Sequence, residues 1–262
     1  MGREKPVADV RAVPTYDMFG LPVSDVDGDG LLALIDGALG RGQRFVYLYA
    51  NAYILNEVAR NPALIDLFDG ADVIVNDGFG SALAIRMVHG VTPARVTMPD
   101  LIDRAAALCI RRDAGMFLLG STEAGVAGSE RELLARHPAL PVVGRQHGYF
   151  DKTPGGAEND AVVAAINASG ADVLLIGFGM PLQERWLRDN VHRLDCTVII
   201  AVGALFDVLS GELKRGPKLL TDNGFEWLTR LLNEPGRLWR RYLIGLPTFF
   251  ARAVMLKLGR RG

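Results

Sequence analysis

The chain has 262 residues, of which 49% are hydrophobic, and a formal net charge of -1 at pH 7. A chain of this length can bury one sizeable core and carry a small appendage. Its near-neutral charge disfavours nucleic acid as the main partner, because proteins that bind nucleic acid usually present a broad basic surface. The charge is uneven, since the sequence after Gly236 has no acidic residue and contains Arg237, Arg240, Arg241, Arg252, Lys257, Arg260 and Arg261.

The N-terminal region has no continuous apolar segment of the kind that secretory signals contain. No stretch approaches the ~18 apolar residues of a membrane-spanning helix. Cys109 and Cys196 lie inside apolar runs with no partner at metal-ligand spacing. This is typical of small core residues in a reducing cytoplasm. We therefore expect a cytoplasmic protein.

Apolar runs typical of strands alternate with helical patterns along most of the chain. We predict no element before about Gly20. We predict strands at residues 45–49, 73–75, 116–119, 142–143, from 173 and at 198–202, and helices at 31–39, 52–68, 81–88, 101–111, 123–136, 157–168 and from 181. Strands separated by helices of this length predict an α/β fold, with helices on both faces of a doubly wound, mostly parallel, Rossmann-like sheet.

The pattern changes after Gly211. Residues 214–217 (Lys-Arg-Gly-Pro) break the alternation, and a helix is expected at 224–232, ended by Pro235. The remainder is predicted to be helical, with interruptions at Gly245 and Pro247. We therefore predict an α/β domain at 1–211 and a basic helical appendage at 212–262.

A glycine turn and a proline follow the strand that begins at Val173. Gly177 and Gly179 would let a ligand approach the backbone, and the helix that opens at Pro181 would offer free N–H groups to an anion. A tight packing turn without a ligand explains the same residues equally well. Gln183 stands near the position of the third glycine of a dinucleotide fingerprint. A nucleotide- or NAD-binding oxidoreductase is therefore disfavoured, but it remains the alternative.

Asp77 is the strongest candidate for an acid or base. It follows the strand at 73–75, and ligands of open α/β sheets bind at the carboxyl ends of parallel strands. There it would take a proton from a hydroxyl nucleophile. Asp77-Gly78 is as typical of a plain turn. Asn51 follows the strand at 45–49, where its amide would hold a sugar hydroxyl or cap the next helix.

Three other polar features have competing structural explanations. Asp100 precedes a helix and is by default its N-cap or a first-turn acid, and a lone histidine such as His147 is more often structural than catalytic. Residues 25–36 match the spacing of a calcium loop, but no helix enters it, so we expect a polar turn in which Asp29 caps a helix. A calcium-responsive binding module stays open as a non-enzyme alternative.

The appendage combines arginines with aromatic residues. Arg230, Arg237, Arg240 and Arg241 lie close in sequence to aromatic residues, and guanidinium groups bind phosphate oxygens bidentately. They would neutralise a diphosphate leaving group, or serve as helix C-terminal charges, or contact an anionic membrane. From residue 246, apolar side chains recur at helical spacing among basic ones, which is typical of an interfacial membrane helix, or of a helix packed on the core or on a neighbouring subunit: Phe249, Phe250, Ala253, Val254 and Leu258.

Taken together, the motifs resemble a known family. They run from about residue 19 to 242, in the family's order: Asp77–Gly80, Arg95 with Asp100-Leu101, Leu118–Gly120, His147–Phe150, Gly177–Glu184, Val202–Asp207, Gly211, Lys214–Pro217, Gly224–Leu231 and Glu234–Arg237. By these motifs the chain is similar to the WecG/TagA/CpsF family of bacterial glycosyltransferases.

The resemblance implies an inverting, metal-independent enzyme without a cofactor. It would move N-acetylmannosamine, its uronic acid or glucose from a UDP-sugar to a polyprenyl-diphosphate-linked acceptor, as in teichoic acid or exopolysaccharide synthesis. It would work as a peripheral protein on the inner face of the plasma membrane, and a homo-oligomer is left open. Asp77 would be the base. The implied substrate-binding residues are Asn51, Arg95, Asp100, Gly120, His147, Gly177, Gly179, Gln183, Arg230, Arg237 and Arg240.

Three positions depart from the family pattern. Met98 replaces a glycine, Gly216 replaces an alanine, and Tyr49 stands where a small or hydroxyl-bearing residue is expected. These changes fall near the implied sugar pocket. They leave the identity of the donor sugar open, but they do not affect the implied class of reaction.

Overall fold

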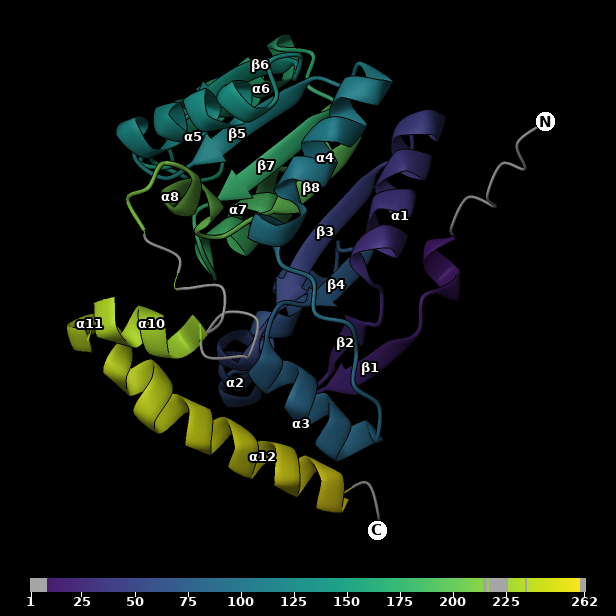
Figure 1. The fold of residues 1–262 in the computed structure, drawn as a ribbon, viewed down its shortest axis with the longest axis vertical. Helices are drawn as coiled ribbons and strands as arrows, with labels where there is room; N and C mark the ends of the chain where they lie inside the picture. The colour runs from purple at the N-terminus through teal and green to yellow at the C-terminus, as the bar shows by residue number, and fades with distance from the viewer. Residues whose placement is uncertain (1–8, 214–215, 217–225, 234, 260–262) are drawn as a thin grey trace.

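The structure is a computed structural model that describes residues 9–213, 216, 226–233 and 235–259. An eight-stranded sheet forms its centre, in the order β1-β2-β4-β3-β8-β7-β5-β6 (Figure 1). β1 and β2 are antiparallel, and the other neighbours are parallel. The strands are β1 Thr15–Met18, β2 Leu21–Ser24, β3 Phe45–Ala50, β4 Val73–Asn76, β5 Met116–Gly120, β6 Val142–Gln146, β7 Val173–Gly177 and β8 Val198–Ala201.

Helices cover both faces of the sheet, which confirms the predicted doubly wound α/β fold. On one face lie α1 Gly28–Arg41, α4 Met98–Arg112, α5 Glu123–Arg136 and α8 Leu205–Leu209. On the other face lie α2 Ala52–Arg60, α3 Phe79–His89, α6 Ala157–Ala168, α7 Leu182–Asn190 and α12 Leu246–Gly259. Short 3-10 helices are η1 Val10–Ala12, η2 Pro62–Phe68 and η3 Val191–Arg193.

Each central strand contributes to two cores because successive side chains point to opposite faces. In β3, Leu48 packs in the core that contains Ile54 of α2, whereas Tyr47 packs in the core that contains Leu31 of α1. Both faces of the strand are therefore buried. This explains why β3, β5 and β7 are nearly continuous apolar runs in the sequence.

The N-terminal hairpin was not predicted. β1 and β2 are short and joined at Phe19 and Gly20, both of which have positive φ. Two other details also differ from the sequence prediction. The segment 52–68 is two helices, with a break at Asn61 (φ -136°, ψ 88°) before Pro62. Asp27, not Asp29, caps α1, because its Oδ1 accepts a hydrogen bond from the Gly30 amide at 2.8 Å.

The C-terminal segment forms α10 Glu226–Asn233, α11 Pro235–Trp239, the π-helix η4 Arg240–Gly245 and α12. Gly245 and Pro247 do not interrupt it, contrary to the prediction, because the π-helix continues directly into α12. The helical stretch Arg240–Gly259 has 20 residues and a mean hydropathy of 1.2, enough by length and composition to cross a membrane. No stretch of this kind was expected from the sequence.

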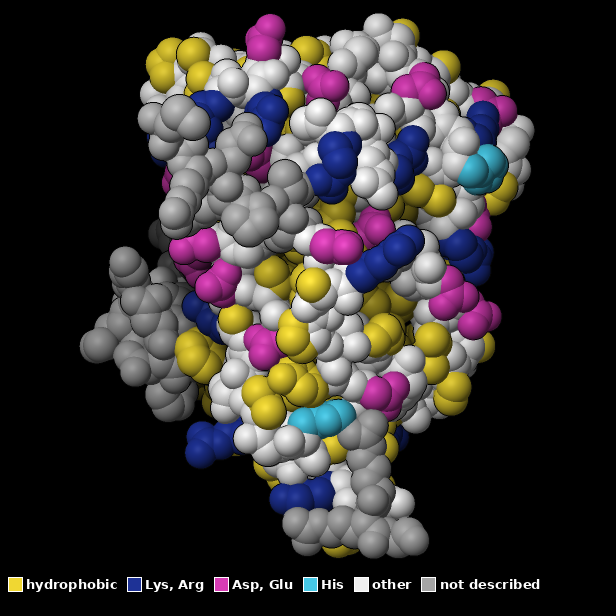
Figure 2. Space-filling model, turned by 90° about the vertical axis from the view of Figure 1, so that its right-hand side faces the viewer, with side chains coloured by type: hydrophobic (Ala, Val, Ile, Leu, Met, Phe, Trp, Pro, Cys, Tyr) yellow, Lys and Arg dark blue, Asp and Glu magenta, His cyan; other side chains and the backbone are white. Residues whose placement is uncertain are grey.

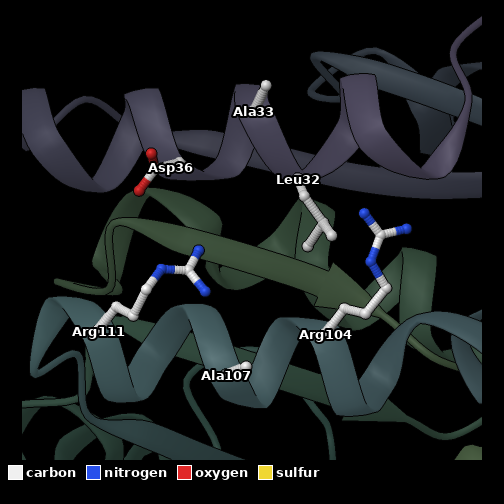
Figure 3. Close-up of a pocket in the computed structure, with 6 residues that line it drawn as sticks. All are labelled: Leu32, Ala33, Asp36, Arg104, Ala107 and Arg111. Atoms are coloured by element: carbon white, nitrogen blue, oxygen red, sulfur yellow. The ribbon is translucent and has the colours of Figure 1, made fainter. Parts of the chain in front are cut away.

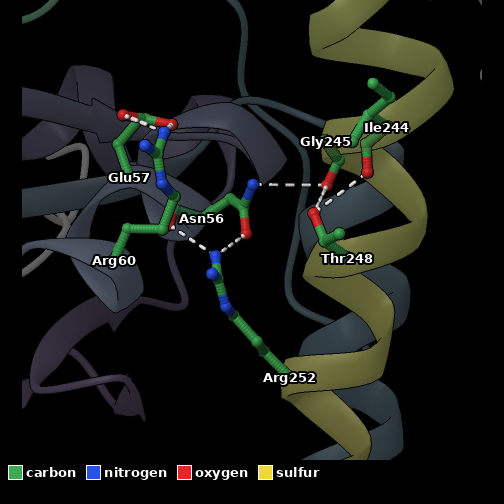
Figure 4. Close-up of polar contacts among 7 residues, drawn as sticks. All are labelled: Asn56, Glu57, Arg60, Ile244, Gly245, Thr248 and Arg252. Carbon is green, nitrogen blue, oxygen red and sulfur yellow. Dashed lines mark hydrogen bonds and ion pairs between the residues drawn. The ribbon is translucent and has the colours of Figure 1, made fainter.

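α12 is attached to the α/β layer by polar and apolar contacts. Asn56 of α2 donates from Nδ2 to the Gly245 carbonyl at 3.3 Å, and the Arg252 guanidinium donates to the backbone and side-chain oxygens of Asn56 (Figure 4). Phe249 and Ala253 are fully buried in the core shared with α2 and α3. Of the interpretations left open for these side chains, packing on the core is confirmed. The division at Gly211 remains a prediction.

Candidate active site

The candidate site lies at the carboxyl ends of the central strands. The helix after β3 and the helix after β8 cover opposite faces of the sheet, as do the helices after β7 and β5. Where connections from neighbouring strands leave to opposite faces, an open sheet forms a crevice that binds ligands. The appendage helices lie at the end of the molecule toward which the arrows of β3 and β7 point (Figure 1).

Asp77 and Asn51 lie side by side at this edge. Asp77 directly follows β4, and its amide donates to the Ala50 carbonyl of β3 at 2.9 Å. A Cβ atom built on Gly78 would lie 3.5 Å from the Cβ of Asn51. Asn51 caps α2, since its Oδ1 accepts hydrogen bonds from the amides of Tyr53 and Ile54 at 3.1 and 3.2 Å. The helix-cap alternative for Asn51 is therefore confirmed.

Gln183 links the ends of three strands. Its Oε1 accepts hydrogen bonds from the amides of Gly179 and Gly203 at 3.3 and 3.2 Å. Its Nε2 donates to the Tyr49 hydroxyl at 3.3 Å and to Glu184 Oε1 at 2.8 Å. An amide can donate two hydrogen bonds and accept two, so the protein satisfies all four. Gln183 is 1% exposed, and its substrate contact stays a prediction.

Glu184 was quoted in the sequence motif but given no role of its own. Its side chain is fully buried, and its Oε2 atom has no hydrogen-bond partner. Burial raises the pKa of Glu184 to about 7, against the hydrogen bond from Gln183 that favours the ionised form. Burial, with the charges of Glu184 and Asp77, raises the pKa of Tyr49 well above its usual range. Both carboxylates therefore act on the same phenol.

The glycines of the edge have structural reasons to be glycine. A Cβ on Gly120 would lie 2.4 Å from the Gly177 carbonyl oxygen, and one on Gly177 would lie 2.7 Å from the Gly203 carbonyl oxygen. Gly179 instead has φ +76° and open space around its Cα, so it is the glycine whose backbone a ligand can approach. Tight packing accounts for Gly120 and Gly177, and their contact with substrate remains a prediction.

Arg95 lies close to the start of α3. Its guanidinium carbon is 4.7 Å from the centre of the Phe79 ring, two residues after Asp77. Asp100 is a first-turn acid of α4, as the default interpretation had it. Its carboxylate accepts a hydrogen bond from Thr97 at 2.7 Å and lies 3.4 Å from an Arg95 nitrogen. Arg95 is therefore held between an acid and an aromatic ring.

His147 is not brought to Asp77. It follows β6, and four strands separate β6 from β4 in the sheet, which at the usual strand spacing is about 24 Å. Its Nδ1 accepts a hydrogen bond from the Tyr149 amide at 3.2 Å, within its own turn. The same loop holds Lys152, which the sequence analysis missed. Its Nζ lies 4.3 and 4.5 Å from the ring centres of Phe150 and Phe178.

The appendage arginines are placed differently. The side chains of Arg230 and Arg237 lie outside the described part of the chain. Arg240 is exposed and stacks on Trp239, with its guanidinium carbon 5.2 Å from the ring centre. Arg241 lies 4.2 Å from the centre of the Tyr53 ring, in the first turn of α2. Both arginines were grouped in the sequence as candidates to neutralise a diphosphate, but the family resemblance placed only Arg240 among the substrate-binding residues.

The carboxylates of the acidic loop at residues 25–36 do not converge on one point, as the ligands of a calcium ion would. Asp25 accepts from the Ala94 amide, Asp27 caps α1, Asp29 pairs with Arg104 and Asp36 pairs with Arg112. In the part of the chain that the structure describes, no group of three or more His, Cys, Asp or Glu side chains could hold a metal ion.

A shallow groove between α1 and α4 lies apart from the strand ends. It is lined by Leu32, Ala33, Asp36, Arg104, Ala107 and Arg111 (Figure 3). Its polar residues include Asp36 and Arg104, which already form ion pairs. On the face shown in Figure 2, basic and acidic side chains are interspersed and form no continuous basic patch. The groove and the mixed-charge face are therefore weaker candidates for a substrate-binding site than the strand ends.

The geometry can be compared with known proteins. A model of the Glycosyl transferase WecG/TagA/CpsF family matches residues 16–262, nearly the whole chain. This family implies a transferase in cell-surface polysaccharide biosynthesis that uses, in general, a nucleotide-sugar donor and a lipid-linked acceptor. The chain therefore belongs to the WecG/TagA/CpsF family of glycosyltransferases.

Proposed function

We propose that the protein transfers a sugar from UDP to a polyprenyl-diphosphate-linked acceptor, with inversion at the anomeric carbon of the sugar. The placement of Asp77 beside Asn51, at the carboxyl ends of neighbouring strands, is the observation that carries this proposal. In an inverting transfer, one carboxylate takes the proton of the acceptor hydroxyl as that oxygen attacks the sugar carbon, and UDP leaves from the opposite face. Asp77 takes that role.

The donor sugar is of the N-acetylmannosamine type, its uronic acid or glucose. Asn51 contributes its Nδ2 group, for which the described residues provide no hydrogen-bond partner, to a sugar hydroxyl. Arg95 stands beside Phe79 and binds an anionic part of the substrate. The oxidoreductase alternative is not supported by the family to which the chain belongs. Protection against thermal unfolding by UDP, with none by NAD(P)H, would separate the two.

Replacing the proposed base tests this assignment. Asp77→Asn keeps the shape of the side chain but cannot accept a proton, so kcat should fall on the order of 10²–10⁴-fold. The affinity for the UDP-sugar should stay nearly unchanged in a titration. Asp66→Asn, an exposed residue of η2, is the matched control and should keep full activity. Retention of wild-type kcat by folded Asp77→Asn would show that Asp77 is not the catalytic base.

Metal independence is part of the proposal. Arginines take the charge of the diphosphate leaving group, in place of a divalent ion. Transfer from the UDP-sugar should therefore continue after dialysis against EDTA, measured as release of UDP. Loss of transfer on EDTA treatment and its return with Mg²⁺ or Mn²⁺ would show that the leaving group needs a metal.

The enzyme is proposed to lie on the inner face of the plasma membrane, because its acceptor is membrane-anchored. α12 offers a suitable surface, since one face packs on the core while Val254, Met255 and Leu258 are 41, 61 and 62% exposed. A helix with one packed face suits the membrane surface better than a position across it. Arg252 is engaged with Asn56, so it does not belong to the lipid-facing basic residues.

The exposed face of α12 can be altered without uncovering the core. Met255→Glu with Leu258→Glu should reduce binding to vesicles of anionic lipid roughly 10-fold or more, because two charges would enter the apolar interface. Ala139→Glu with Val143→Glu, exposed apolar positions at the far edge near β6, is the control. Co-sedimentation with vesicles measures both. Equal binding by the two double variants would exclude α12 as the membrane contact.

A further inference from the structure

The hydroxyl of Tyr49 lies in the crevice between β3 and β8. Tyr49 is the second-to-last residue of β3, and a Cβ atom built on Gly203, just after β8, would lie 2.5 Å from its hydroxyl oxygen. A glycine at position 203 therefore leaves room for the phenol. The other residues of β3 are buried, whereas Tyr49 packs against the cores on both faces and stays partly exposed. The phenol thus belongs to the crevice where an open sheet binds its ligand.

The hydrogen bond from Gln183 determines what this hydroxyl can offer to a ligand. The Gln183 Nε2 group can only donate, so the phenol oxygen is the acceptor, at 3.3 Å. The other Nε2 hydrogen goes to Glu184, and the amide oxygen of Gln183 accepts from two backbone N–H groups, which the NH2 group could not do. A hydroxyl also has one hydrogen to donate. In the described part of the chain, no residue accepts that hydrogen from Tyr49.

The charges around the phenol keep it protonated and favour an uncharged partner. Burial raises the pKa of Tyr49 well above its usual range, and the negative charges of Glu184 and Asp77 add to this shift. The hydrogen bond from Gln183 and the positive charge of Arg241 oppose it with smaller effects. A carboxylate that received the phenol hydrogen would be repelled by Asp77, and by Glu184 when it is ionised. A sugar hydroxyl or the carbonyl of an acetamido group would accept it without this repulsion.

We infer that Tyr49 donates a hydrogen bond to an uncharged oxygen of the donor sugar, and that the crevice around it selects a neutral sugar over its uronic acid. This inference rests on the proposed function and narrows the donors to the N-acetylmannosamine type or glucose. Tyr49 keeps its proton and forms no covalent bond, so it acts by binding the sugar. Position 49 departs from the family pattern, so the inferred selection belongs to this chain rather than to the family as a whole.

The test compares neutral sugar nucleotides with their uronic acids. Dissociation constants are measured by calorimetry for UDP, UDP-N-acetylmannosamine, UDP-glucose and the uronic acids of both sugar nucleotides. The wild type should bind the better neutral ligand roughly 10-fold or more tightly than its uronic acid, because like charges placed together are costly. Tyr49→Phe keeps the ring and loses only the hydroxyl, so it should weaken that neutral ligand roughly 3- to 10-fold, the range for one hydrogen bond. UDP and the uronic acid should bind within about 2-fold of wild type.

Tyr16→Phe removes a phenol hydroxyl from β1, where it is hydrogen-bonded to Asp25 at 3.4 Å, and is the control that should leave every constant unchanged. Equal weakening of UDP and the sugar nucleotides by Tyr49→Phe would show that the hydroxyl does not contact the sugar. Unchanged affinity for the neutral ligand would contradict the inference too. A wild type that binds the uronic acid at least as tightly would overturn the selection and keep the UDP donor, whereas one that binds none of these nucleotides would refute the proposed function as well.

Discussion

The candidate site depends on one buried amide. Gln183 is hydrogen-bonded to Tyr49 near the end of β3, to Gly179 after β7 and to Gly203 after β8, and it also donates to Glu184. Parallel strands are tied along their length by the sheet, but the loops beyond their ends have no ladder to hold them. The four hydrogen bonds of Gln183 replace that ladder. Without them, the buried Gly203 N–H would lose its partner, at a cost of about 1–3 kcal/mol, and so would the partly buried Gly179 N–H.

The charges at the same edge are compatible with the anionic donor that we propose for it. Asp77 and Glu184 both act on the Tyr49 phenol, and burial holds the pKa of Glu184 at about 7. Two fully ionised carboxylates would repel a diphosphate, whereas one carboxylate, one partly protonated group and a nearby arginine make a site that tolerates it. Tyr49, at a position where a small or hydroxyl-bearing residue was expected, therefore contributes to the electrostatics of this edge.

Much of this edge could be predicted from the sequence. Buried runs that stop at Asn51, Asp77 and Gly177 are strands whose carboxyl ends meet, so these residues were correctly placed at one edge. The strand order could not be predicted, and it separates His147 from Asp77 although both follow strands. The hairpin Thr15–Ser24 was missed because its strands are short and polar residues interrupt their apolar pattern.

The orientation of the appendage arginines could not be predicted either. Helical spacing of 3.6 residues gives no reason to distinguish Arg240 from Arg241 as the residue that points inward. The segment is a π-helix, in which hydrogen bonds span five residues, and such turns recur at functional sites. Asn56 then binds both Gly245 and Arg252, which fixes the helix on α2 (Figure 4). These long-range contacts leave no signal in a local sequence pattern.

The central claim is that the loops held by Gln183 form the nucleotide-sugar site. Hydrogen–deuterium exchange with and without UDP tests it most directly, because binding slows exchange where the ligand contacts or orders the backbone. The account predicts slower exchange in residues 49–53, 77–80 and 177–184, and no change in the groove between α1 and α4. Protection confined to that groove, or to no part of the strand ends, would contradict it.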